Sequence, residues 1–242
     1  MSLEQKRNNV CSLKIIDMPI DDYRAIWYNN RKKGSKTGAM ISIYDGKNMT
    51  DRQLLQAVAL DRAVYPQDYW LDDETALGYL HACPEIYTYA AEGDKLVAYL
   101  NMSCIDEESY LTLRSGSRND LCIGPENLRR PVARQKNYLY FSSIVVAPDY
   151  RRKGVAQKLL SRFGEKLTML RAHGIYFTDV IADAISSHGE KLCESWGMKR
   201  EGASVSGGKL FGYSMQQGEP NAALDAWVKK LCGGKDGQSV SI

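Results

Sequence analysis

The sequence lacks several features that mark particular classes of protein. Its six cysteines include no Cys-x-x-Cys pair, so we expect no bound metal and no disulfide framework. No apolar run approaches the roughly 18 residues of a membrane span, so we expect no membrane association. The formal net charge of +3 is too small for the basic surface that usually binds nucleic acid, and we expect no nucleic-acid partner.

The first residues lack the apolar core of a signal peptide. Together with the scattered cysteines, this favours a reduced, cytoplasmic protein. At 242 residues the chain is long enough for one sizeable domain with extensions. We divide it into an N-terminal extension (1–38), a central domain (39–216) with a basic insert at about 107–137, and a C-terminal helix with a flexible tail (217–242).

Two common phosphate-binding motifs are also absent. A P-loop would require Gly-x-x-x-x-Gly-Lys-Ser/Thr, and a dinucleotide fingerprint would require Gly-x-Gly-x-x-Gly after the first strand. The chain instead has Arg151-x-x-Gly154-x-Ala156 after an apolar segment (138–147). An apolar stripe with helical spacing follows, and it ends at His173 and a glycine. The pattern predicts a strand, a basic turn and a long helix.

Such a turn is suited to bind a pyrophosphate. The free backbone N–H groups at the helix start, the positive end of the helix dipole and the cations Arg151, Arg152 and Lys153 converge on one point. Gly154 lets a phosphate approach closely because glycine has no Cβ. The alternative is an ordinary strand–turn–helix whose charges are only solvated.

The motif resembles the acetyl-CoA signature, Arg/Gln-x-x-Gly-x-Gly/Ala, of the GCN5-related N-acetyltransferases, the GNAT superfamily. Between Met40 and Met215 the expected elements follow the order β-α-α-β-β-β-α-β-α-β-β, which is the order of that fold. The resemblance implies an α/β (mixed α+β) GNAT fold, with a central mixed sheet of about seven strands flanked by helices. In that fold the fourth and fifth strands run parallel and splay apart to hold the pantetheine arm of the cofactor.

Local signals place these elements along the chain. Thr50 is suited to cap the first helix, which Pro66 ends, and Asp72-Asp-Glu-Thr opens the second. Periodicity fades over 107–137, where we expect an inserted loop. A further helix is expected over 221–232. The expected strands are 40–44, 85–91, 96–105, 138–147, 176–182, 198–204 and 209–215.

The resemblance implies acetyl-CoA as cofactor and assigns residues to it. The backbone of the fourth strand would bind pantetheine, with the N–H of Val146 directed at the acetyl carbonyl. The N–H groups from Arg152 through Gln157 would hold the pyrophosphate, while the side chain of Val155 is spaced to pack into the core. The expected cofactor-binding residues are Ile144, Val145, Val146, Arg151, Arg152, Lys153, Gly154, Val155, Ala156, Gln157 and Lys158.

Acyl transfer to an amine requires a neutral amine, a polarised carbonyl and a proton for the departing thiolate. Family members often supply that proton from a tyrosine in Tyr-x-x-x-Gly-Phe, and here Cys193 stands at the matching position. It is either the catalytic acid or a buried structural cysteine. Some relatives carry a glutamate as base on the fourth strand, where this chain has Tyr138. Tyr138, Tyr140 and Ser142 form a candidate relay of hydroxyls and water, or else the tyrosines are ordinary strand aromatics.

Aromatic residues between the first two helices lie where GNAT proteins usually form the acceptor wall. Tyr65, Tyr69 and Trp70 are therefore candidate substrate contacts, with core or lid packing as the alternative. We expect an acetyl-CoA-dependent N-acetyltransferase that acts on a small-molecule or peptide amine by direct attack in a ternary complex, as a monomer or homodimer. Two alternatives remain: a non-catalytic acyl-CoA-binding regulatory protein, and a transferase for a longer acyl chain.

Overall fold

A computed structural model of the chain describes residues 40–214 and Ala226. The described residues all belong to one of the two units into which the chain divides, residues 33–242. The expected N-terminal extension and the expected helix over 221–232 lie outside the described residues, apart from Ala226. No helix of the described part is long and apolar enough to cross a membrane.

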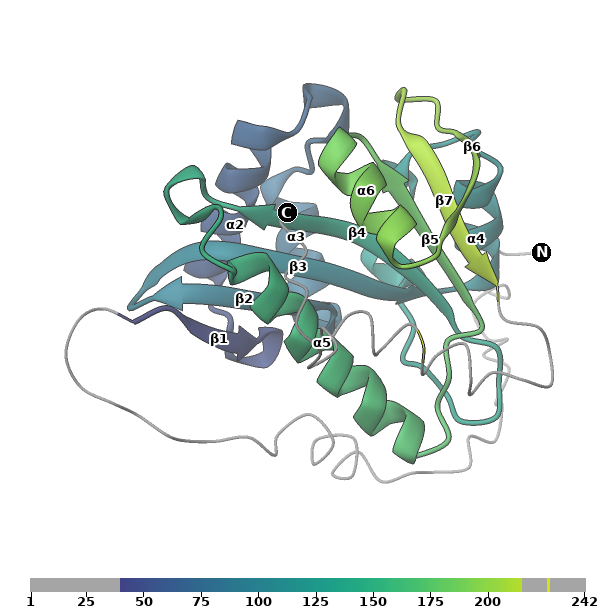
Figure 1. The fold of residues 1–242 in the computed structure, drawn as a ribbon, viewed down its shortest axis with the longest axis horizontal. Helices are drawn as coiled ribbons and strands as arrows, with labels where there is room; N and C mark the ends of the chain where they lie inside the picture. The colour runs from purple at the N-terminus through teal and green to yellow at the C-terminus, as the bar shows by residue number, and fades with distance from the viewer. Residues whose placement is uncertain (1–39, 215–225, 227–242) are drawn as a thin grey trace, which may run out of the picture. The chain divides into compact units, whose positions relative to one another are not determined.

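A seven-stranded mixed sheet forms the centre of the described region (Figure 1). The strand order is β1-β2-β3-β4-β5-β7-β6, and every neighbouring pair is antiparallel except β4 and β5, which are parallel. This confirms the expected mixed sheet flanked by helices. The strands are β1 (Ser42–Asp45), β2 (Tyr87–Glu92), β3 (Lys95–Ile105), β4 (Tyr138–Val146), β5 (Asp179–Ala184), β6 (Lys199–Ala203) and β7 (Lys209–Ser214).

Helices cover both faces of this sheet, as Figure 1 shows. On one face lie α2 (Asp51–Val64), α3 (Asp73–Ala82) and α4 (Glu107–Arg114), and on the other lie α5 (Val155–Ala172) and α6 (Ser187–Ser195). Short 3-10 helices connect them: η1 (Gly46–Asn48), η2 (Gln67–Tyr69), η3 (Pro84–Ile86), η4 (Asp120–Cys122), η5 (Pro125–Asn127) and η6 (Pro148–Tyr150).

Side-chain caps explain where most of these helices begin. Thr50 accepts from the N–H of Gln53, whose side chain bonds back to the N–H of Thr50, which completes a capping box. Asp72 caps α3 and Ser186 caps α6 in the same way. The cap at Thr50 and the start of the second helix at Asp72 are those expected from the sequence.

The segment 107–137 is not the expected continuous loop. Asp106 caps α4 by accepting from the N–H of Ser109 at 2.8 Å. Tyr110 and Leu113, three residues apart, bury their side chains against Tyr138 and neighbouring residues in one apolar cluster. Helix α4 is only two turns long, and most of its other side chains are polar or charged, so its apolar stripe was too short to recognise in the sequence.

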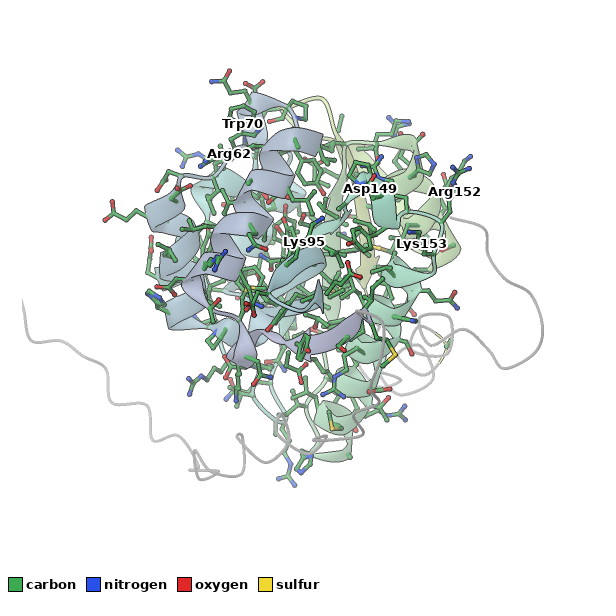
Figure 2. The ribbon with its side chains drawn as sticks, turned by 90° about the vertical axis from the view of Figure 1, so that its left-hand side faces the viewer. Arg62, Trp70, Lys95, Asp149, Arg152 and Lys153 are labelled. Carbon is green, nitrogen blue, oxygen red and sulfur yellow. The ribbon has the colours of Figure 1, made fainter. Side chains whose placement is uncertain are left out.

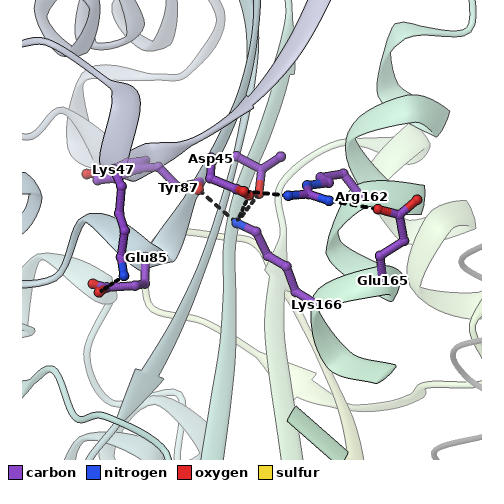
Figure 3. A network of polar contacts seen from close by, with 8 residues as sticks. Asp45, Lys47, Glu85, Tyr87, Arg162, Glu165 and Lys166 are labelled. Atoms are coloured by element: carbon purple, nitrogen blue, oxygen red, sulfur yellow. Dashed lines mark hydrogen bonds and ion pairs between the residues drawn. The ribbon is translucent and has the colours of Figure 1, made fainter. Parts of the chain in front are cut away.

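A buried ionic network attaches α5 to the edge of the sheet (Figure 3). The side chain of Lys166 is 2% exposed, and its Nζ lies 2.8 Å from Asp45 Oδ1 and 2.8 Å from Thr88 Oγ1. Arg162, one turn earlier, contacts the other oxygen of Asp45 at 2.6 Å. Burial alone would raise the pKa of Asp45, but the charges of Lys166 and Arg162 lower it below its ordinary value.

Candidate functional site

Strands β4 and β5 separate beyond their first four residue pairs. Their pairing runs from Tyr138 with Asp179 to Phe141 with Ala182 and then stops. The register with β3 shifts at the same place, because Met102 pairs with Phe141 while Asn101 pairs with Ser143. Ser142 is therefore the extra residue of a β-bulge, which bends β4 away from β5.

A cavity of about 860 Å³ fills the space that this divergence opens. Its walls come from residues 142–146 of β4, the end of β5, the start of α5, the buried side of α6 and one face of α2. Two regions can be distinguished. The α5 end holds the basic turn, and the opposite region, which we call the acceptor side, is lined by Asp61, Tyr65, Tyr69, Asp120 and Asp183.

The backbone of Val146 is directed into this opening. The N–H of Ala147 donates to Val97 O at 2.9 Å, and Val146 pairs with Ala98. In an antiparallel ladder this arrangement turns the N–H and C=O of Val146 toward the other edge of the strand. The carbonyl accepts from Arg151 Nε at 3.1 Å, which leaves the N–H facing the cavity.

The basic turn presents the uncapped N-terminus of α5. Gly154 is the N-cap residue and supplies no side-chain cap, in contrast to α2, α3, α4 and α6. The N–H groups of Val155, Ala156 and Gln157 consequently have no partner within the helix. Gly154 has φ +72°, and a Cβ added there would meet no atom within 4 Å, so the space beside the turn is open. Arg152 also has positive φ, at 60°.

Cationic side chains surround the turn, as Figure 2 shows for Arg152 and Lys153. Arg152 is exposed, and Lys153 lies 5.3 Å from the ring centre of Tyr150, with Lys95 of β3 at 5.4 Å from the same ring. Tyr150 in turn donates a hydrogen bond to Glu92. This group places positive charge next to the free N–H groups of α5.

The structure brings most of the expected cofactor residues to the cavity. It is lined by Ile144, Val145, Val146, Arg151, Arg152, Gly154, Val155, Ala156 and Gln157. Lys153 and Lys158 do not line it and are exposed beside it. The side chain of Val155 is 2% exposed and packs into the core, in agreement with its spacing.

Some of the expected catalytic residues line the cavity and others lie outside it. Cys193 is buried and lines the cavity, and burial raises the pKa of its thiol to about 12. Tyr138 lies outside the cavity lining and donates to Glu107 of α4. Tyr140 and Ser142 line the cavity, and the Tyr140 hydroxyl donates to Asp120 Oδ2 at 3.0 Å. A relay through all three hydroxyls is therefore not assembled.

The expected acceptor aromatics are placed differently from one another. The Tyr65 hydroxyl lies 3.1 Å from Ser143 Oγ, and the Tyr69 hydroxyl donates across the cavity to Asp183 Oδ2 at 3.4 Å. Trp70 does not line the cavity, and its indole N–H donates to Tyr65 O at 2.8 Å. Trp70 is 39% exposed.

Three carboxylates of the acceptor side were not expected from the sequence. Burial, and then the charge of Asp120, raises the pKa of Asp61 to about 7, although a hydrogen bond from Tyr99 opposes the shift. Burial, and then the charge of Asp183, raises the pKa of Asp120 to about 6, against a hydrogen bond from Tyr140. The pKa of Asp183 is raised by burial. Asp120 lies within the stretch read as basic, so no sequence signal marked it.

These carboxylates do not form a metal site. Within residues 40–214, no group of three or more His, Cys, Asp or Glu side chains could hold a metal ion. The Oδ1 atoms of Asp61, Asp120 and Asp183 are each buried without a hydrogen-bond partner. The acceptor side is therefore acidic, and the α5 end is basic.

Comparisons with known proteins agree with this architecture. The sequence model of the acetyltransferase (GNAT) family matches residues 53–189, which is more than half of the chain. The fold is similar to the loading GNATL domain of CurA from Lyngbya majuscula, with a TM-score of 0.50 and 12% identity over 72% of this chain and 98% of that one. At this identity the likeness shows the fold alone.

Two further structures were crystallised with ligands. NAA60 of Arabidopsis thaliana in complex with acetyl-CoA matches with a TM-score of 0.49 and 14% identity over 73% of this chain and 100% of that one. The paia N-acetyltransferase of Thermoplasma acidophilum in complex with coenzyme A matches with a TM-score of 0.46 and 11% identity over 72% and 99%. A sequence search of curated proteins gave no match.

Proposed function

Because the chain belongs to the GNAT family of acetyltransferases, we propose that it moves an acetyl group from acetyl-CoA to an amine. In this reaction the C–N bond forms as the C–S bond breaks, the amine loses one proton, and the departing CoA thiolate gains one to become a thiol. One observation carries the proposal. The uncapped N-terminus of α5 and the free N–H of Val146 open into the same cavity.

The residues at the α5 end fit CoA. The N–H groups of Val155, Ala156 and Gln157 would bind the pyrophosphate, because helix N-termini favour anions. Arg152 and Lys153 would add charge-assisted contacts to its phosphates. The free edge of β4 would pair with the amides of the pantetheine arm as an added strand does.

When bound, the thioester supplies an electrophilic carbonyl carbon and a thiolate leaving group. The N–H of Val146 would then donate to the carbonyl oxygen as negative charge develops there. Such a donor contributes roughly 3 kcal/mol to transition-state stabilisation in enzymes where one has been removed. The bulge at Ser142 matters because it bends the strand that presents this N–H.

Asp120 is the general base in this proposal. Its pKa of about 6 keeps it ionised at neutral pH, so it can accept the proton that the neutral amine loses as it attacks the carbonyl carbon. Tyr140 holds Oδ2, so Oδ1 is the oxygen that remains for the substrate. Residue 120 follows closely on the α4 segment and reaches the cavity beside the bulge of β4.

We assign Cys193 a packing role. A thiol with a pKa of about 12 is a weaker acid than an ordinary thiol with a pKa of about 8.5, so proton transfer from Cys193 to a CoA thiolate would be uphill. The thiolate is instead protonated by solvent after it leaves. Positioning of the two substrates then supplies much of the rate.

The test is an acetyl-transfer assay with a panel of amines. Purified protein is mixed with acetyl-CoA and each amine, thiol release is followed, and the acetylated product is identified by mass. Alkyl monoamines, diamines and peptides with a free amino terminus are compared, and propionyl-CoA and octanoyl-CoA replace acetyl-CoA in parallel. Amine-dependent release with acetyl-CoA is expected. CoA binding without amine-dependent thiol release would instead indicate a non-catalytic acyl-CoA-binding protein. Faster turnover with propionyl-CoA or octanoyl-CoA than with acetyl-CoA would show that the enzyme transfers a longer acyl chain.

A further inference from the structure

The acceptor side holds more negative charge than acetyl transfer needs. One base is sufficient for the reaction, yet Asp61, Asp120 and Asp183 all line the same region of the cavity. They come from α2, η4 and β5, so three separate elements each contribute a carboxylate to the lining of the cavity. The charges of Asp61 and Asp120 interact, as do those of Asp120 and Asp183. Asp61 and Asp183 have no role in the mechanism above.

These carboxylates have no cationic partner in the part of the chain that the structure describes. Arg62 lines the cavity but binds Asp73 at 2.7 Å and Leu71 O at 2.9 Å. The other lysine or arginine side chains that line it lie at the α5 end: Arg151 donates to Val146 O, and Arg152 lies just before α5.

Each carboxylate also keeps one oxygen without a partner. Tyr140 binds Oδ2 of Asp120 and Tyr69 binds Oδ2 of Asp183, while all three Oδ1 atoms are buried and unpaired. A buried carboxylate oxygen without a donor costs stability, so the site is organised for donors that a ligand brings. Ammonium groups would supply such donors and also balance the negative charge, and the unpaired oxygens of three acids could accept from more than one of them.

The remaining wall of the acceptor side is apolar and aromatic. Ala57, Val58 and Val64 of α2 line it with Tyr65 and Tyr69. This surface suits a methylene chain, and the tyrosine rings can face an ammonium group. A chain of methylenes that ends in ammonium groups matches both the carboxylates and the apolar wall.

We propose that the acceptor is an aliphatic diamine or polyamine, whose reacting nitrogen faces Asp120 while Asp61 and Asp183 bind a second ammonium group. This inference rests on the proposed function, since it names the substrate class of the same site. The raised pKa values of Asp61 and Asp120 agree with it, because a site without a cation disfavours the ionised form of clustered acids. Binding of a diammonium ligand near pH 6.5 therefore releases protons from Asp61 and Asp120, while Tyr69, Tyr99 and Tyr140, which contact the acids, stay protonated.

The experiment compares matched probes by calorimetry with CoA present. 1,4-Diaminobutane, 1,6-diaminohexane and spermidine are each compared with n-butylamine. At least one of the first three is expected to bind about 30-fold or more tightly than butylamine, which is roughly 2 kcal/mol. Equal affinity of all four in the wild-type protein would overturn the inference, and this comparison needs no variant.

Variants then locate the second ammonium group. Asp61→Asn and Asp183→Asn keep the size and one acceptor oxygen of each side chain but remove one charge, and each is expected to reduce the diamine-to-monoamine affinity ratio at least about fivefold. The control is Asp94→Asn in the β2–β3 turn, which should keep the wild-type ratio. A ratio unchanged in both cavity variants would contradict the assignment, and so would preferred binding of a peptide amino terminus.

The two proposals fail in different ways. If no amine of the panel is acetylated, the proposed function is wrong, whatever the binding ratio. If monoamines and peptides are acetylated as efficiently as diamines, with equal affinities, the enzyme assignment holds and only the acceptor class is wrong.

Discussion

The Tyr140 hydroxyl donates to Asp120 Oδ2 at 3.0 Å and so connects β4 to the 3-10 helix η4. Tyr140 pairs with Ile181 one position before β4 and β5 separate. The bond therefore fixes one carboxylate oxygen at the base of the cleft and leaves the other toward the cavity. This arrangement is the reason for assigning the base to Asp120 instead of to a residue of β4 itself.

Replacing Asp120 by asparagine tests that assignment. Asp120→Asn is expected to lower kcat by about a hundredfold or more at saturating amine, because general-base catalysis typically contributes factors of 10²–10⁴. The stability of this variant should equal or exceed that of the wild type at pH 8, since burial disfavours the ionised carboxylate and raises its pKa. Steady-state kinetics and thermal unfolding are measured on the same samples. A loss below threefold would exclude Asp120 as base, and Asp94→Asn is the surface control.

The pH dependence of the wild type follows from the same carboxylate. The base must be ionised to accept a proton, and the pKa of Asp120 is about 6, so kcat falls as the pH drops through that value. Asp61 has a pKa of about 7, and its protonation weakens amine binding. As the pH is lowered, KM should therefore begin to rise near pH 7, before kcat falls near pH 6. Profiles of kcat and KM between pH 5 and 9 check this order. A kcat that is flat down to pH 5 would contradict it.

Cys193 is expected to matter little for turnover. Cys193→Ala should lower kcat less than tenfold, because the pKa of about 12 makes the thiol a poor proton donor and solvent can protonate the thiolate. Its main effect should be a loss of stability of about 1 kcal/mol from a small cavity beside α6. Kinetics and urea unfolding separate the two effects. A loss of activity above a hundredfold in folded protein would restore Cys193 as the acid.

Most of the fold was predictable from the sequence because its signals are local. The capping residues Thr50 and Asp72, the proline at position 66 and the apolar strand before the basic turn each act over a few residues. Helix α4 was missed because it is short and gains its stability from contacts of Tyr110 and Leu113 with distant strands. Tertiary packing, which local periodicity does not report, decides such elements.

The two halves of the site also differed in how far the sequence predicted them. The CoA end is one continuous segment, so a motif could reveal it. The acceptor side combines Asp61, Asp120 and Asp183 from three elements, and no spacing in the sequence relates them. The bulge at Ser142 also depends on pairing with β3, and it changes which side chains of β4 share a face. The expected relay from Tyr138 to Ser142 assumed regular alternation.

The network around Lys166 predicts a stability change that depends on pH (Figure 3). Asp45→Asn should cost about 3 kcal/mol at pH 7, because it removes the anionic partner of a buried ammonium that also contacts Tyr87 O and Thr88 Oγ1. The lowered pKa of Asp45 means that its contribution is complete above its ordinary value of 3.8 and is lost as the pH falls below it. The stability lost in Asp45→Asn should therefore become smaller as the pH falls below about 3.8.

A matched control lies in the same network. Glu165 is 52% exposed and contacts Arg162 at 2.9 Å, so Glu165→Gln should cost less than about 1 kcal/mol. Urea unfolding at pH 7 and at about pH 3, below the ordinary pKa of Asp45, measures both variants. Equal costs for Asp45→Asn and Glu165→Gln would show that the buried pair has no special role in holding α5.

The most direct test of the central claim is a calorimetric titration of CoA into wild-type protein and Gly154→Glu. The substitution places a carboxylate where the N-terminus of α5 should bind the pyrophosphate, so affinity is expected to fall at least about a hundredfold, or roughly 3 kcal/mol. Gly174→Glu is the matched control at the other end of α5, with φ +73° against +72° and equally open space. Retained affinity in Gly174→Glu and loss in Gly154→Glu is the predicted result. Unchanged affinity in a folded Gly154→Glu protein would contradict the site, and with it the proposed transfer.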